Sequence, residues 1–170
     1  MISLCRRVTR TVIALPIAAL ALSACVSGPA PSSVSCDGIV AKFNSPVVEQ
    51  CHNRYRPYKM DVSSSAAQQK ANSLASSLTS CANLSNYHTA GGTLLALYGG
   101  ATSVGENLYC YGSGAGCPSA TFGATKAMNG WLSSTGHKAN LDRFAGAWVN
   151  AGAACGGSGL YFAVAQFHAP

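Results

Sequence analysis

Apolar residues recur every three or four positions in three segments of the chain, which is the spacing of one face of an α-helix. This spacing predicts helices near 46–56, over 67–81 and near 122–134. The first ends before Pro57, because proline has no N–H to continue the helical hydrogen bonding. The second is the longest and runs over four turns. Its apolar positions are Ala67, Ala71, Leu74, Leu78 and Cys81.

The pattern changes in the last part of the chain, where β-branched, aromatic and small residues dominate. Segments 147–155 and 159–168 are separated by a Gly-Gly-Ser-Gly sequence, which predicts an antiparallel hairpin with a longer turn. The Gly-rich stretches 89–100 and 112–119 are predicted to be loops that contain short apolar pieces. Helices followed by paired strands predict an α+β fold, with helices packed on an antiparallel sheet.

Residues 1–25 have the features of an export signal. A positively charged start is followed by an apolar stretch, 11–22, that is too short to span a bilayer. It ends in Leu-Ser-Ala-Cys, the shape of a bacterial lipobox, so we predict cleavage before Cys25 and a lipid on this cysteine. The alternative is a plain secreted protein in which Cys25 is a spare thiol. Residues 26–45 then form a Pro/Ser-rich tether and N-terminal extension, and 46–170 form the domain.

The net charge of the chain falls once the signal segment is removed. Eight of the eleven Lys and Arg residues remain against five acidic residues, which gives a net charge of +3 instead of +6. These charges are scattered and form no basic run. Nucleic-acid binding is therefore not supported.

The remaining cysteines are even in number, which in an exported chain predicts disulfide bonds in an oxidising compartment. The pairing is open among the possible connectivities, although Cys110 with Cys117 is the pair that sequence proximity favours, because it closes a Gly-rich loop. No Cys-x-x-Cys pair occurs, so a zinc–thiolate site is not expected. The six cysteines are Cys36, Cys51, Cys81, Cys110, Cys117 and Cys155.

Candidate chemistry lies in three residues that follow or separate the predicted helices. His88 comes after the second helix, His137 after the third, and Glu106 lies between them. Two imidazoles and one carboxylate on loops are the groups of a metal site or an acid–base site. Spacing alone leaves open the alternative that they are scattered loop residues bonded to the backbone.

Several short motifs, taken in order, resemble the CAP superfamily, which comprises cysteine-rich secretory proteins, insect venom antigens and plant pathogenesis-related proteins. The resemblance covers roughly 46–168 and matches the bacterial type of the family. Each motif is weak alone, whereas their shared order is specific. The motifs are CHNRYR (51–56), CANLSNYH (81–88), GENLY (105–109), WLSSTGHKANL (131–141) and YFAVAQF (161–167).

The resemblance implies a CAP-type α-β-α sandwich with a cavity formed by His88, Glu106 and His137. A glutamate of the family falls on Ser134 here, a departure that weakens any mechanism needing two carboxylates. The resemblance also implies a tight backbone turn at the glycine before Glu106, and a structural role for Asn107, whose side chain bonds backbone to hold the loop. Its first-helix motif implies a structural histidine at His52.

The resemblance further implies an extracellular or cell-envelope protein, anchored by its lipid. We favour a non-enzymatic module that binds a small lipid- or sterol-like ligand, with zinc or another divalent cation held weakly by His88, His137 and Glu106. One alternative is a metal-dependent hydrolase using the same three residues. It is less favoured because such a hydrolase also needs a general base besides its metal ligands, and the only other glutamate is Glu49. The other alternative is an envelope scaffold without a ligand.

Overall fold

The computed structural model describes residues 38–44, 56–112, 114 and 116–170. Every element below belongs to the unit Pro31–Pro170. The predicted signal segment, the tether up to residue 37 and nearly all of the predicted first helix lie outside the described residues, together with Cys25, Cys36, Cys51 and His52. No helix in the described part is long and apolar enough to cross a membrane.

A four-stranded mixed sheet forms the centre of the domain, in the order β1-β3-β4-β2. β1 runs parallel to β3, and the other neighbours are antiparallel. The hairpin predicted over 147–168 is confirmed as β3 and β4, although the sheet is not purely antiparallel. The strands are β1 Lys59–Met60, β2 Ser103–Gly112, β3 Trp148–Cys155 and β4 Leu160–Ala169.

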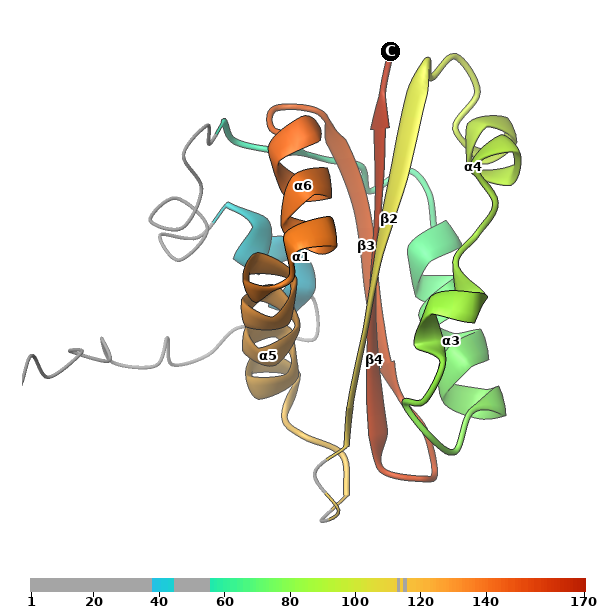
Figure 1. Cartoon of the computed structure of the whole chain (residues 1–170), viewed down its shortest axis with the longest axis vertical. Helices are drawn as coiled ribbons and strands as arrows, with labels where there is room; N and C mark the ends of the chain where they lie inside the picture. Colours follow the sequence, from blue (N-terminus) through green and yellow to red (C-terminus); the bar gives the residue numbers. More distant parts are fainter. Residues whose placement is uncertain (1–37, 45–55, 113, 115) are drawn as a thin grey trace, which may run out of the picture. The chain divides into compact units, whose positions relative to one another are not determined.

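Helices cover both faces of this sheet, which confirms the predicted α+β class (Figure 1). One face carries α1 (Gly38–Phe43), α5 (Ala120–Ser133) and α6 (Thr135–Arg143). The opposite face carries α3 (Ala66–Ser77), the 3₁₀ turn η1 (Leu84–Tyr87) and α4 (Gly91–Leu97).

Two hydrophobic cores result, one on each face of the sheet. Successive residues of a strand point to opposite faces, so in the central strand β4 Phe162 and Val164 pack with α3, whereas Ala165 and Phe167 pack with α1, α5 and α6. Burial on both faces explains why residues 161–167 are almost continuously apolar in the sequence.

The predicted helices over 67–81 and 122–134 are present as α3 and α5. Their predicted apolar positions are buried up to Leu74 in α3, but that helix ends at Ser77, and Cys81 lies beyond it. Helix α4 occupies part of the stretch 89–100 that we predicted to be a loop, and α6 carries His137, which we expected on a loop after the third helix. Each has one buried residue, Leu94 and Leu141 respectively, so neither shows a helical period of apolar residues.

Strand β2 corrects the prediction for the segment around Glu106. Gly105 lies within the strand and does not form a tight turn. A Cβ atom at this position would lie 2.5 Å from Cε2 of Phe144, a side chain that is itself buried. The glycine is therefore required for close packing of α6 and the turn after it on the sheet, and not for a special backbone conformation.

Among the described residues two disulfide bonds are present, Cys81–Cys110 and Cys117–Cys155. They confirm that the protein contains disulfides, but the predicted Cys110–Cys117 pair is wrong. Cys110 lies on β2, where its neighbour is the segment before η1, and Cys117 lies beside the end of β3. The Gly-rich loop between the two cysteines thus connects two crosslinks instead of being closed by one.

Candidate functional site

The candidate residues meet at β2, the edge strand of the sheet. Glu106 and Asn107 are consecutive in this strand, so their side chains point to opposite faces. Glu106 faces the side of α3, η1 and α4, whereas Asn107 faces α6. His88 and His137 approach from these two sides, so the site straddles the outer edge of β2.

Glu106 is a buried carboxylate held by groups from three elements. Lys70 Nζ on α3 lies 2.8 Å from Oε1 and 3.0 Å from Oε2. Thr89, which precedes α4, donates its backbone N–H to Oε1 at 2.8 Å and its hydroxyl to Oε2 at 3.0 Å. Gln166 Nε2 on β4 donates to Oε2 at 2.8 Å. Both oxygens are therefore fully engaged by protein donors.

These contacts decide the protonation state of Glu106. Burial alone would raise the pKa of the carboxyl group, but the hydrogen bonds from His88, Gln166, Lys70 and Thr89 outweigh it and hold the pKa at about 2. Each of these donors stabilises the charged form. Glu106 is consequently ionised at neutral pH and acts as a fixed negative charge.

His88 follows η1, and its ring contacts this fixed charge. Nδ1 lies 3.3 Å from Glu106 Oε1, and the side chain is 37% exposed. When Nδ1–H donates to the carboxylate, the neutral ring carries its lone pair on Nε2, on the opposite side of the imidazole. A carboxylate that fixes the tautomer of a histidine in this way is the usual support for a metal-binding imidazole.

His137 on α6 supplies the second ring. Its centroid lies 6.5 Å from that of His88, and the two planes are inclined by 43°. Burial lowers the pKa of His137, and the neighbouring His88 lowers it further. Both effects favour the neutral imidazole, which is the form that binds a metal ion.

The backbone of α6 is fixed to the edge strand next to this ring. Asn107 Nδ2 donates to the carbonyl of His137 at 3.1 Å. Asn140, one turn further along α6, donates to Asn107 Oδ1 at 2.9 Å and to the carbonyl of Glu106 at 3.3 Å. Asn107 was predicted to bond backbone and does so, but it positions a helix instead of a loop.

The structure thus brings together all three residues that were predicted to share a site. Glu106 is on β2 and His137 is on α6, so of the three only His88 lies outside a helix or strand. Ser134 lies between α5 and α6, three residues before His137, and its hydroxyl does not cap α6. No three His, Cys, Asp or Glu side chains within the described ranges are grouped to hold a metal ion.

Sequence reasoning missed the groups that hold Glu106. Lys70 lies between the apolar positions of the predicted helix 67–81, and Thr89 begins the stretch 89–100 that we predicted to be a loop. Gln166 carried a usable signal, because it is the one polar residue in the apolar run 161–167 and is only 1% exposed. Buried amides are hydrogen-bonded, so a partner for it was to be expected.

Gln166 also continues the polar contacts across the sheet. Its register partners are Glu106 on β2 and Asn150 on β3, so three buried polar side chains lie in one row. Tyr98, which follows α4, donates its hydroxyl to Gln166 Oε1 at 2.7 Å. Asn150 Oδ1 accepts from the N–H of Ala67 at 2.9 Å, at the start of α3. The row therefore links the site to both covering helices on this face.

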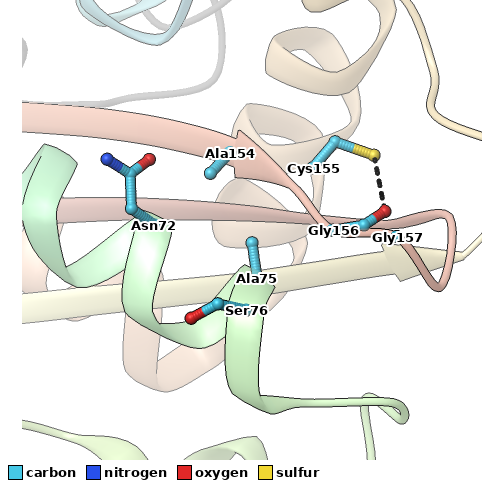
Figure 2. A pocket seen from close by; sticks show the side chains of 7 residues that line it. All are labelled: Asn72, Ala75, Ser76, Ala154, Cys155, Gly156 and Gly157. Carbon is cyan, nitrogen blue, oxygen red and sulfur yellow. Dashed lines mark hydrogen bonds between the residues drawn. The ribbon is translucent and has the colours of Figure 1, made fainter.

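A separate pocket of about 290 Å³ lies between α3 and the end of the β3–β4 hairpin (Figure 2). It contains none of the predicted site residues, and no charged side chain lines it. We assign it no function. Its lining residues are Asn72, Ala75, Ser76, Ala154, Cys155, Gly156 and Gly157.

Comparison with known proteins does not identify the chain. No family model matches it, and no curated protein matches it significantly.

Proposed function

We propose that the chain is an exported, CAP-type binding module in which His88 and His137 hold a divalent cation such as zinc, leaving open positions for a small ligand. The observation that carries this proposal is the contact between Glu106 and Nδ1 of His88. It leaves Nε2 of His88 available on the side away from the carboxylate, with a second neutral imidazole nearby.

The CAP-type assignment rests on the order of the motifs and is consistent with where they lie. GENLY belongs to the edge strand, CANLSNYH leads to His88, and the Gly-His motif belongs to α6. Helices on both faces of the sheet are what an α-β-α sandwich requires. This arrangement supports the resemblance independently of the spacing of the motifs.

The geometry of the three residues favours a metal ion bound by the two imidazoles alone over one that is also bound by Glu106. Two histidines on one zinc ion, with Zn–N bonds of about 2 Å, have ring centroids roughly 5–6 Å apart. The observed 6.5 Å therefore requires a small inward rotation of one ring. Glu106 supports the site indirectly, because a cation that bound its oxygens would have to displace the ammonium group of Lys70.

Such a site has modest affinity and retains open coordination positions. An anionic group, such as the carboxylate of a lipid, completes it without a further protein ligand. We therefore retain the lipid- or sterol-like ligand that the resemblance implies, and place its polar end at the two histidines.

Hydrolysis is less well supported than binding. Metal-assisted hydrolysis needs a base that accepts a proton from the attacking water, and an effective base has a pKa near the working pH. Glu106, with a pKa of about 2 and both oxygens occupied, is a poor proton acceptor. The same group is well suited to orient His88.

Export and anchoring belong to the same proposal. The signal-like segment 1–25 and the lipobox cysteine Cys25 support a location at the cell envelope, with a lipid as the membrane anchor. Mass spectrometry of the mature N-terminus tests this part. A chain that begins at Cys25 with an added acyl mass is expected, and an unmodified Cys25 contradicts the anchor.

Calorimetric titration of the mature protein with zinc tests the metal site. We expect saturable binding that weakens at least tenfold in His88→Ala and in His137→Ala. Glu106→Gln should retain binding but weaken it about 10- to 100-fold, because removing a group that orients a metal ligand has this effect. Asp142→Asn is the matched control, since it removes a half-exposed carboxylate from the helix that carries His137.

Unchanged zinc binding in both histidine variants would overturn the metal site. Thermal melts of each variant separate loss of the site from loss of the fold. A fatty-acid binding assay with and without zinc then tests the ligand. Absence of binding in both conditions would leave the alternative of an envelope scaffold.

A further inference from the structure

A second candidate site lies in a groove of about 530 Å³ between segment 61–65 and the C-terminal end of α4. Its volume is within the range of small-molecule sites. The lining is dominated by hydroxyl, carboxylate and imidazole groups. The lining residues are Asp61, Ser63, Ser64, Ser65, Leu97, Tyr98, Gly99 and His168.

The centre of this groove is a second carboxylate–histidine pair. His168 Nε2 on β4 lies 3.1 Å from Asp61 Oδ2, and both side chains are largely buried. The other carboxylate oxygen accepts from the backbone N–H and the hydroxyl of Ser63, at 3.0 Å and 2.6 Å. Oδ1 of Asp61 thus has two partners and Oδ2 has one, which leaves Oδ2 able to accept a further hydrogen bond. Nδ1 of His168 has no hydrogen-bond partner among the described residues.

The His168 ring is fixed before any ligand binds. Tyr98 stacks on it with ring centroids 4.3 Å apart and planes inclined by 7°. The hydroxyl of Tyr98 is in turn held by Gln166 at 2.7 Å. A fixed imidazole edge in a polar groove is a preformed hydrogen-bonding group, and preformed groups lose little entropy when a ligand binds.

An aromatic surface adjoins the polar lining. A smaller hollow of about 150 Å³ shares Gly99 and His168 with the groove and is also lined by Trp148. Trp148 is 39% exposed, although large aromatic side chains usually become buried. A ligand that extends from the groove into this hollow would meet hydroxyl groups first and an indole ring next.

Charge narrows the chemical class of this ligand. The negative Asp61 disfavours phosphate and other anions. Lys59 Nζ lies 5.6 Å from the centroid of the Trp148 ring, but neither hollow is lined by lysine or arginine. The polar lining disfavours a lipid chain. A metal ion is disfavoured because it would have to displace the hydrogen bonds that Asp61 already makes with Ser63 and His168. Many hydroxyl groups together with one apolar face describe a pyranose sugar.

We propose that the groove between Asp61–Ser65 and α4 binds a neutral pyranose sugar, with Asp61, His168 and the neighbouring serines bonding its hydroxyl groups and Trp148 packing against its apolar face. This site is separate from the His88–His137 site, so the proposal does not depend on a bound metal ion. Hydrogen bonds through Tyr98, Gln166 and Glu106 link the two sites.

Tryptophan fluorescence provides a direct test with glucose, N-acetylglucosamine and short oligomers of each as probes. The chain has two tryptophans, and Trp131 is completely buried, so a change on sugar binding would report Trp148. We expect a saturable change in emission for at least one probe. The response should disappear in Trp148→Phe, while calorimetry still detects binding.

Variants within the groove complete the test. His168→Gln and Asp61→Asn should weaken sugar binding at least tenfold, while Ser73→Ala, on the exposed face of α3, should leave it unchanged. Far-UV circular dichroism confirms that each variant is folded. Absence of binding of every probe by the wild-type protein would overturn the proposal, and so would wild-type affinity in both groove variants. Better binding of oligomers than of single sugars would identify a polymeric glycan as the source.

Discussion

Lys70 bridges both carboxylate oxygens of Glu106, at 2.8 Å and 3.0 Å, and so joins α3 to the edge strand of the sheet. The carboxylate side chain is 2% exposed and the lysine side chain 16% exposed. An ion pair in this environment cannot be broken without leaving a buried charge. The pair therefore fixes the charge against which His88 is oriented.

Replacing Lys70 by methionine is expected to destabilise the fold. The change keeps most of the side-chain volume but leaves Glu106 with a buried negative charge and fewer donors. We expect a loss of about 2 kcal/mol in the free energy of unfolding, below the value for a fully buried pair because three other groups still contact the carboxylate. Urea unfolding measures it.

The exposed pair of Lys138 and Asp142 on α6 provides the control. The two charges lie 3.2 Å apart, with side chains 30% and 38% exposed. Lys138→Met is expected to change stability by about 0.5 kcal/mol or less, because exposed ion pairs contribute little. Equal losses in the two lysine variants would contradict the importance of the buried pair.

Gln166 lies 60 residues from Glu106 and 68 from Tyr98 in the chain and joins the two, donating to Glu106 and accepting from Tyr98. Gln166→Leu leaves the tyrosine hydroxyl without its acceptor and should cost about 2 kcal/mol, the typical penalty of a buried polar group that loses its partner. Adding Tyr98→Phe removes that orphaned hydroxyl. The double variant should therefore lose less than the sum of the single losses, and strict additivity would contradict the coupling.

The elements that the sequence predicted are those with a clear period. α3, α5 and the β3–β4 hairpin bury regular apolar positions, so the pattern identified them. α4 and α6 each bury one residue and are stabilised by contacts with the sheet, which no local pattern records. Strand β2 was missed because it carries a glutamate and an asparagine at its centre, where a strand usually has apolar residues.

The residues of the candidate site also fall into those that the sequence identified and those that it did not. The histidines and Glu106 were found because they are rare residues in recognisable motifs. The lysine and the glutamine that hold Glu106 were not found, because their roles depend on the packing of α3 and β4 against β2. The disulfide pairing was missed for the same reason, since it follows from which segments lie side by side and not from their distance along the chain.

Gly152 is expected to be essential for the contact between β3 and α3. A Cβ atom there would lie 2.4 Å from Cα of Gln68 and 2.5 Å from its backbone nitrogen. Because the backbone of a packed helix cannot move aside cheaply, Gly152→Ala should destabilise the protein by about 1–3 kcal/mol. Gly92→Ala in α4 is the control, since nothing lies within 4 Å of the added methyl group. Thermal unfolding of both variants gives the comparison.

The two disulfides should differ in their effect on the candidate site. Cys81 precedes the turn that carries His88, and Cys110 lies four residues after Glu106, so this bond fixes the histidine near its carboxylate. The bonds close loops of similar length, with separations of 29 and 38 residues, and each should contribute about 3–4 kcal/mol of stability. Replacing Cys81 and Cys110 by serine should therefore weaken zinc binding more than the same change at Cys117 and Cys155. Calorimetry under conditions where both variants remain folded compares them, and equal zinc affinities would contradict this role.

The contribution of Asp61 to stability should depend on pH. Burial alone would raise the pKa of this carboxyl group, but hydrogen bonds from Ser63 and the contact with His168 hold it below the ordinary value of 3.8. A carboxyl group whose pKa is lower in the folded than in the unfolded protein stabilises the fold at pH values above its pKa in the unfolded protein. This stabilisation is lost as the pH falls through its pKa in the folded protein. Its facing groups are His168 from β4 and Tyr98, which follows α4.

Wild-type protein should therefore be more stable than Asp61→Asn at neutral pH, by about 1 kcal/mol for a charged hydrogen-bond acceptor of this kind. The difference should decline once the pH falls below 3.8 and vanish in stronger acid. Urea unfolding at a series of pH values measures both curves, with Asp142→Asn as a control that removes a half-exposed carboxylate. In strong acid the carboxyl group of Asp61 is protonated in both the folded and the unfolded protein. A stability difference between wild type and Asp61→Asn that persists unchanged there would show that the charge of Asp61 does not contribute to stability.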